Sequence, residues 1–306
     1  MLKSSWAIGL FLATAGVTVA QVKVELLLDQ KQYLLKESLM VGVRVVNHAG
    51  QTLNLAGTNW LSLTVENREK FVVNRIEDVP SPQPLALEST YRATQWLEIG
   101  RAFEFKENSS YTLRARVQID QWSEEIFSEP VMFEIMKGTK LWEQRFGVPA
   151  ATGAQPEMRK YILQQANYLN ELQLYVRVTD DSEGFVYKVL RLAPMLLISQ
   201  PEAQIDTLNR LHVLTQTGMR QFMHVCIDPG GEVVLRNTYA ANNGRPQLKE
   251  SPTGGVYVNG GTRLLRQDDV PGSALLNRPL PARPVPATNP PAITEPTTAD
   301  SAKPAE

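Results

Sequence analysis

The chain has 306 residues, 43% of them hydrophobic, and a formal net charge of −1 at pH 7. At roughly 100–200 residues per domain, this length is enough for about two domains with ordinary hydrophobic cores. Because the net charge is near zero and Lys and Arg are interspersed with acidic residues, we expect no nucleic-acid partner.

The first twenty residues have the pattern of a secretory signal peptide. Lys3 supplies a short basic region, the apolar stretch WAIGLFLATAGVTVA follows, and Thr18 and Ala20 occupy the two positions that a signal peptidase reads. We expect cleavage near Gln21 and export to the periplasm or the medium, with an uncleaved N-terminal anchor as the alternative. No later stretch approaches the ~18 continuous apolar residues of a membrane helix, so we expect no integral membrane segment in the mature chain.

Residues 21–136 are predicted to form a series of short strands. In VKVELLLD, Val22 and Val24 fall on one face of a strand, and Lys23 and Glu25 fall on the other. SLMVGVRVVN alternates in the same way and stops at the turn signal NHAG. About eight such strands, many bounded by Gly, Asn, Asp, Ser or Pro, predict an antiparallel β-sandwich.

One run in this region, KQYLLKESLMVGVRVVNHAG, resembles the start of bacterial Ig-like and fibronectin-III-like domains. The matching pieces are Tyr33, Glu37, Val41–Val46 and Asn47. SSYTLRARVQID, with Tyr111, is similar to a later strand of such domains, and SEPVMFEI is similar to their last strand. The Gly that usually precedes the Glu is Lys36 here, and the Cys…Trp…Cys pattern of Ig domains is absent. The resemblance implies a fold and no active site.

The rest of the chain divides by composition. Residues 137–158 are predicted to be a linker with one short strand, because their centre is rich in Pro, Gly and Ala. Residues 159–270 are predicted to form a second antiparallel β domain, either an open sheet or a second sandwich; a propeller fragment is the alternative that a 47-residue spacing of similar hairpins suggests. Residues 271–306 are rich in Pro, Ala and Thr, and we expect a disordered tail.

The stretch LHVLTQTGMRQFMHVCID carries two of the three histidines and the single cysteine. A hairpin with TGMR as its turn would place His212 opposite Val225 and His224 opposite Val213. Directly opposed residues share a face. This register puts His224 and Cys226 on the face opposite to His212, so the two histidines are predicted not to bind one metal ion.

His224 and Cys226 are the candidate catalytic residues, since they project together and could form a nucleophile pair. Their predicted neighbours are Val, Leu and Phe, and a reactive thiolate needs a polar, partly exposed setting. We therefore favour a structural role for both. No P-loop, HExxH or Ser nucleophile elbow is present, and no cofactor is expected.

Two further candidates are weaker. Asp180, Asp181 and Glu183 could bind Ca²⁺, but they lack a dedicated loop spacing, and a solvated turn is favoured. Trp122 follows a predicted strand and could stack on a sugar or a partner; packing against the sandwich edge is favoured, because large aromatic side chains are mostly buried.

These patterns together predict a secreted or periplasmic, non-catalytic protein that binds or scaffolds at the cell envelope. Its partner would be an envelope protein or a glycan. The first alternative is a carbohydrate-binding or carbohydrate-active envelope protein, and the second is an enzyme that uses His224 and Cys226.

Overall fold

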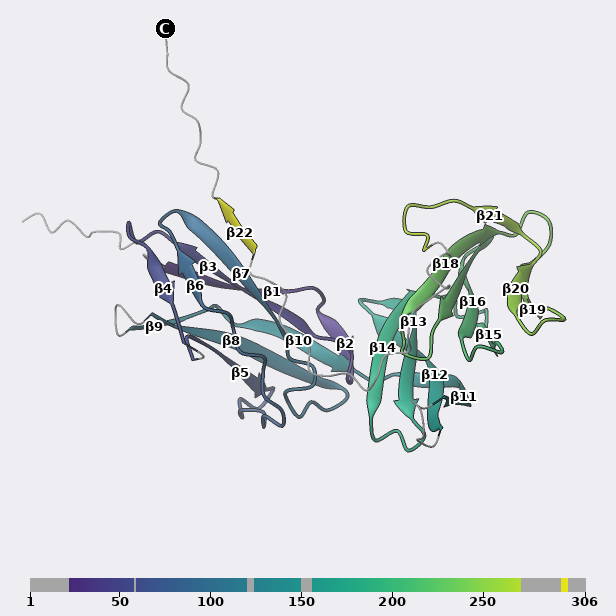
Figure 1. Cartoon of the computed structure of the whole chain (residues 1–306), viewed down its shortest axis with the longest axis horizontal. Helices are drawn as coiled ribbons and strands as arrows, with labels where there is room; N and C mark the ends of the chain where they lie inside the picture. The colour runs from purple at the N-terminus through teal and green to yellow at the C-terminus, as the bar shows by residue number, and fades with distance from the viewer. Residues whose placement is uncertain (1–21, 58, 120–123, 150–155, 271–292, 297–306) are drawn as a thin grey trace, which may run out of the picture.

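Strands make up all of the regular secondary structure in the computed structural model, which describes residues 22–57, 59–119, 124–149, 156–270 and 293–296. The predicted all-β fold class is confirmed for these residues. They form two β-rich lobes that lie side by side (Figure 1). None of the described residues forms a helix that could span a membrane.

The first lobe contains two facing sheets and a small strand pair. One sheet has the order β1 (Val22–Leu28), β3 (Met40–Asn47), β7 (Tyr91–Glu98), β22 (Ile293–Pro296). The other has the order β2 (Gln32–Leu34), β10 (Val131–Met136), β8 (Ser109–Ile119), β5 (Leu61–Asn67), with β9 (Glu124–Phe127) beside β8. β4 (Leu53–Leu55) pairs with β6 (Leu85–Leu87). All of these pairings are antiparallel except that of β2 with β10, which is parallel.

The alternating pattern of the sequence explains the core of this lobe. Val41, Val43 and Val45 of β3 are fully or almost fully buried and pack in one hydrophobic cluster with residues of both sheets. Val22 and Val24 of β1 join the same cluster. Period-two alternation therefore directs one face of each strand into the space between the two sheets.

The second lobe is also a sandwich of two sheets. One sheet has the order β11 (Thr139–Val148), β12 (Glu157–Tyr168), β13 (Glu171–Asp180), β14 (Val186–Pro194). The other has the order β15 (Glu202–Ile205), β16 (Leu211–Gly218), β17 (Gln221–Ile227), β18 (Val233–Ala240), β21 (Thr262–Leu264). A hairpin of β19 (Gln247–Glu250) and β20 (Val256–Asn259) lies outside both sheets. Residues from both sheets share one buried cluster, which makes the lobe a closed sandwich and not an open sheet.

Two predicted segments lie between or beyond these lobes. The stretch 137–158 contributes β11, whose residues pair with β12 along most of its length as an edge strand of the second lobe. Of the Pro-rich stretch 271–306, the described residues are Ile293–Pro296, which pair as β22 with Tyr91–Thr94 of β7. The remainder of the predicted disordered tail lies outside the described residues.

Polar and apolar contacts join the two lobes where β2 approaches β14 (Figure 1). The Arg101 guanidinium donates to the backbone carbonyls of Val186 and Tyr187, at 2.9 and 3.0 Å. The backbone N–H of Leu169 donates to Gln32 Oε1 at 2.8 Å. An apolar cluster that contains Leu34 of the first lobe and Ala166, Tyr175, Val186 and Val189 of the second lies beside these bonds. The lobes are thus fixed to one another by more than the covalent connection.

The turn before β3 explains one departure from the Ig-like pattern. Glu37 accepts the backbone N–H of Leu34 at 2.7 Å, and the Tyr33 hydroxyl donates to Asp29 Oδ1 at 2.6 Å. Between them, Lys36 has a φ of 69°, in the left-handed region that disfavours a residue with a Cβ. Lys36 therefore occupies a position whose backbone conformation favours Gly, the residue usual there in the Ig-like domains that this run resembles.

This turn leads to a stability prediction. Lys36→Gly should raise the free energy of unfolding by about 1 kcal/mol, because it removes the clash of the Cβ in the left-handed conformation. Urea unfolding measures the change. Lys36→Ala is the matched control, since it removes the same charge but keeps the Cβ. Equal stability of the two variants would contradict the explanation.

Candidate functional site

The hairpin of β16 and β17 holds the residues that the sequence singled out, but its register differs from the predicted one. His212 lies opposite Cys226, Val213 opposite Val225, and Leu214 opposite His224. The predicted register, with His212 opposite Val225, is wrong by one residue. The physical reason is an irregularity between Gln216 and Gly218: β16 contains one extra residue there, and Gly218 pairs with Gln221.

Because side chains alternate between the two faces of a strand, a register shift of one residue moves each side chain of β16 to the other face relative to the side chains of β17. His212, Leu214, His224 and Cys226 therefore lie on the same face, and the prediction that the two histidines point away from each other is also wrong. Their rings stack with centroids 5.3 Å apart and an interplanar angle of 19°. The opposite face carries Val213 and Val225 into the core of the sandwich.

A chain of short contacts connects the two histidines to an ion pair. His212 Nδ1 lies 3.1 Å from His224 Nε2, and His212 Nε2 lies 3.2 Å from Asp206 Oδ2. Cys226 Sγ lies 3.5 Å from the same His212 nitrogen. Between two imidazole nitrogens, one must donate its proton and the other must accept it. The contact therefore requires that at least one of the two rings is neutral.

Asp206 orders the turn that leads into β16. Its Oδ1 accepts the backbone N–H groups of Leu208 and Arg210, each at 2.9 Å, and its Oδ2 accepts the Arg210 Nε at 2.6 Å. Burial of Asp206 acts to raise its pKa, but the hydrogen bonds from His212 and Arg210 outweigh burial and hold the pKa at about 2. A charged carboxylate therefore stands at one end of the histidine pair.

His224 and Cys226 are both sealed from solvent, with 4% and 0% of their surface exposed. Burial, together with the charge of His212, lowers the pKa of His224 to about 3. Burial raises the pKa of Cys226 to about 12. Near neutral pH, His224 is therefore uncharged and Cys226 is a thiol and not a thiolate. A buried thiol of this kind is a poor nucleophile.

The cover over this face is the β19–β20 hairpin, which Figure 1 shows on the outer side of β15 and β16. Leu248 of β19 packs in one cluster with Leu214 and Phe222 of the sheet. Its backbone N–H donates to the carboxylate of Glu202 at 2.8 Å. The hairpin thus packs on the same face of the sheet that carries both histidines, beside Leu214, which lies opposite His224.

The three acidic residues considered for Ca²⁺ each serve a different partner. Asp180 accepts the Ser182 hydroxyl and the backbone N–H of Phe185, at 2.6 and 2.9 Å. Asp181 pairs with Arg145 at 2.7 Å, and Glu183 pairs with Lys160 at 2.9 Å. Within the described ranges, no group of three or more His, Cys, Asp or Glu residues is arranged to hold a metal ion. Trp122 lies outside the described residues.

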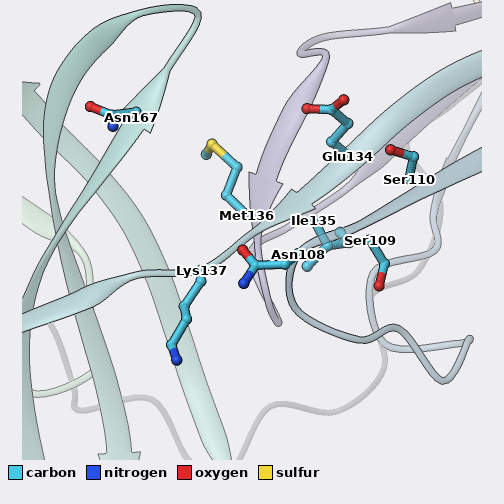
Figure 2. A pocket seen from close by; sticks show the side chains of 8 residues that line it. All are labelled: Asn108, Ser109, Ser110, Glu134, Ile135, Met136, Lys137 and Asn167. Atoms are coloured by element: carbon cyan, nitrogen blue, oxygen red, sulfur yellow. The ribbon is translucent and has the colours of Figure 1, made fainter.

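Two surface pockets lie where the lobes meet. Figure 2 shows the first, of about 380 Å³, whose lining is mostly polar and comes from both lobes. Its residues are Asn108, Ser109, Ser110, Glu134, Ile135, Met136, Lys137 and Asn167. The second, of about 440 Å³, is lined by Arg101 and Lys36 of the first lobe and by Phe185 and Lys188 of the second, among others. No pattern in the sequence identified either pocket, because each is formed by residues far apart in the chain.

Comparisons with known proteins leave the chain without an assigned family. No family model matches the sequence, and no curated protein matches it. A solved structure that is similar to part of the chain is the crystal structure of Spo0M, the sporulation control protein from Bacillus subtilis. The TM-score is 0.23 at 7% identity, over 57% of this chain and 90% of that chain. At this TM-score, the likeness supports no conclusion about fold or function.

The burial of Cys226 leads to a prediction about thiol labelling. In the native protein at neutral pH, we expect a disulfide reagent to react with Cys226 at least about a hundredfold more slowly than in urea, because the thiol is both buried and protonated. The release of the chromophore measures the rate, and Cys226→Ser gives the background. Rapid labelling of the native protein would restore the possibility of a reactive thiol.

The burial of His224 predicts how stability depends on pH. Its pKa is about 3 in the folded chain and about 6.5 in the unfolded chain, so the unfolded state binds more protons between these values. The free energy of unfolding should therefore decrease as pH falls from about 6.5, with a slope of up to about 1.4 kcal/mol per pH unit from this residue. The pKa of Asp206 is also lowered in the folded chain, so its protonation decreases the free energy of unfolding further, but only below about pH 4.

Urea unfolding at several pH values between about 7 and about 4.5 tests this slope. His224→Gln should flatten it, because the titrating group is removed. His48→Gln is the matched control, since His48 is exposed and its replacement should leave the slope as it is in the wild type. An unchanged slope in His224→Gln would contradict the prediction.

Proposed function

We propose that the protein is a secreted or periplasmic, non-catalytic binding or scaffolding protein of the cell envelope. The observation that carries the proposal is the sealing of Cys226 and His224, since these two residues were the only nucleophile pair that the sequence suggested. A side chain with 0% of its surface exposed and a pKa raised to about 12 cannot meet a substrate as a thiolate.

The joint between the lobes supports a scaffolding role. Arg101 and the apolar cluster around Tyr175 tie two sandwiches together, so the outer loops of the two lobes are held at a set separation. Fixed loops on a rigid β framework are a common way to present a binding surface. We also propose that the first lobe is an Ig-like module; its sandwich architecture and the left-handed Lys36 turn support this.

A group of aliphatic side chains on the second lobe is the best candidate for the binding surface. Leu197, Ile198 and Met219 are 84%, 90% and 94% exposed. The loops that carry them adjoin, because the backbone N–H of Leu196 donates to the Gln216 carbonyl at 3.2 Å. Single exposed aliphatic residues are ordinary, but neighbouring ones that protrude this far are typical of contact sites.

Capture from an envelope extract, followed by mass spectrometry, tests the proposal. We expect the wild type and Cys226→Ala to retain the same partner, and the double variant Leu197→Asp/Ile198→Asp to lose it. The double variant should fold normally, because both side chains are exposed. Phe71→Asp, at a 70% exposed position of the first lobe, is the matched control.

Comparison with a chain that lacks residues 271–306 shows whether the sandwiches or the tail carry the surface. Loss of the partner only on removal of the tail would overturn the assignment to Leu197 and Ile198. A phenotype of a deletion strain that the wild type restores, and that a correctly folded Cys226→Ala does not, would overturn the non-catalytic proposal.

A further inference from the structure

The layer between the sheet and the β19–β20 hairpin is unusually polar for a place sealed from water. Its buried polar residues are Asp206, His212, His224 and Asn237, each no more than 6% exposed. Burying such groups in place of apolar ones is costly unless every group finds a partner. Asn237 Oδ1 and Gln204 Oε1 have no hydrogen-bond partner among the described residues.

The contact between the histidines depends on the protonation of both rings. His212 Nδ1 and His224 Nε2 lie 3.1 Å apart, and one of them must accept. If both rings carry a second proton, both facing nitrogens are donors, and two positive charges stand in stacked rings 5.3 Å apart. The contact is therefore compatible with a positive charge on one of the two rings at most. Protonation of the second ring removes the hydrogen bond between the rings and adds charge repulsion.

The groups that face this pair do not compensate a second charge. The Asp206–Arg210 turn presents one carboxylate and one guanidinium, and these already pair at 2.6 Å. β17 presents Cys226, whose thiol is neutral, and β18 presents the neutral Asn237 opposite His224. β15 presents the neutral Gln204 opposite His212. Glu202, opposite Leu214, accepts a hydrogen bond from the backbone N–H of Leu248 in the hairpin. On the hairpin, Lys249, Glu250 and Tyr257 are exposed to solvent.

The β19–β20 hairpin is hydrogen-bonded to the turn before β16, whose Asp206 contacts His212. The backbone N–H of Thr207 donates to the carbonyl of Gly254, in the hairpin turn, at 3.1 Å. Gly254 has a φ of 78°, and a Cβ at this position would collide with the Thr207 side chain. Asp206, the neighbour of Thr207, contacts His212. Asp206 and Thr207, which are adjacent in the chain, thus connect the histidine pair to the hairpin.

The hairpin itself is easily released. β19 and β20 form an isolated two-stranded sheet, and such a hairpin is marginally stable unless it packs against other elements. Its attachments include the packing of Leu248, the bond from Leu248 to Glu202, and the bond from Thr207 to Gly254. Local opening of this unit would hydrate both histidines without unfolding the sandwich core, which lies on the other face of the sheet.

We propose that the His212–His224 pair is an acid-operated latch: protonation of the second ring breaks the contact and releases the β19–β20 hairpin from the sheet. The open form exposes Leu214, Phe222 and Leu248, which pack together in the closed form. Because the open form binds a proton that the closed form excludes, its population rises as the medium becomes acidic. The latch is independent of the binding role proposed above.

Hydrogen exchange followed by mass spectrometry on the full chain tests the latch, with rates corrected for the intrinsic effect of pH. Between about pH 6.5 and about pH 4.5, we expect the opening constant of peptides from residues 247–259 to rise by up to about tenfold per pH unit. Peptides from β3 and β12 should keep their protection. His224→Gln should remove the pH dependence, and the exposed His48→Gln should retain it.

A second measurement uses the wild type alone, in case the His224 variant does not fold. Cys226 is fully buried, and its Sγ lies 3.5 Å from His212 Nε2. If the pair opens in acid, the labelling of Cys226 by 4,4′-dithiodipyridine, a reagent that reacts with thiols in acid, should become faster as pH falls. The proposal is overturned if the hairpin loses protection only together with the whole chain. It is also overturned if neither hairpin exchange nor thiol labelling increases with acid, or if the increase persists in a folded His224→Gln.

Discussion

The single extra residue in β16, between Gln216 and Gly218, sets the chemistry of the second lobe. Side chains of a strand alternate between its two faces, so this residue decides which side chains of β16 join those of β17. With it, His212 meets His224 and Cys226, while Val213 and Val225 enter the sandwich core. The polar layer, its cover and the acid sensitivity that we propose all depend on this register.

The two faces of the β16–β17 hairpin have different surroundings for a physical reason. One face packs in a buried cluster with the inward-facing side chains of β12 and β13, which are mainly apolar, and apolar partners fill that space without a loss of hydrogen bonds. The other face is covered by a small hairpin and by the Asp206 turn, which supply polar partners. The histidines are tolerated in a buried position because Asp206 and their mutual contact satisfy them.

The burial of Cys226 and His224 is one basis of the binding role that we propose. A thiol and an imidazole that are neutral and enclosed do not meet a substrate, whereas the side chains of Leu197, Ile198 and Met219 are 84%, 90% and 94% exposed. The Arg101 bonds across the joint give these loops a stable framework. Binding surfaces of this type need exposure and rigidity, and they need no reactive group.

The sequence by itself determined the all-β class and most strand positions, because period-two alternation and turn residues are local signals, as in β3 and in the Asp228 turn after β17. It also favoured a structural role for His224 and Cys226, because their neighbours along the strand are apolar. Tertiary structure decided the hairpin register, the meeting of His212 with His224, and the Asp206 and β19–β20 cover. These features depend on one bulged residue and on contacts between segments that are distant in the chain. Neither a bulge nor a long-range contact changes the local hydrophobic pattern from which strands are predicted.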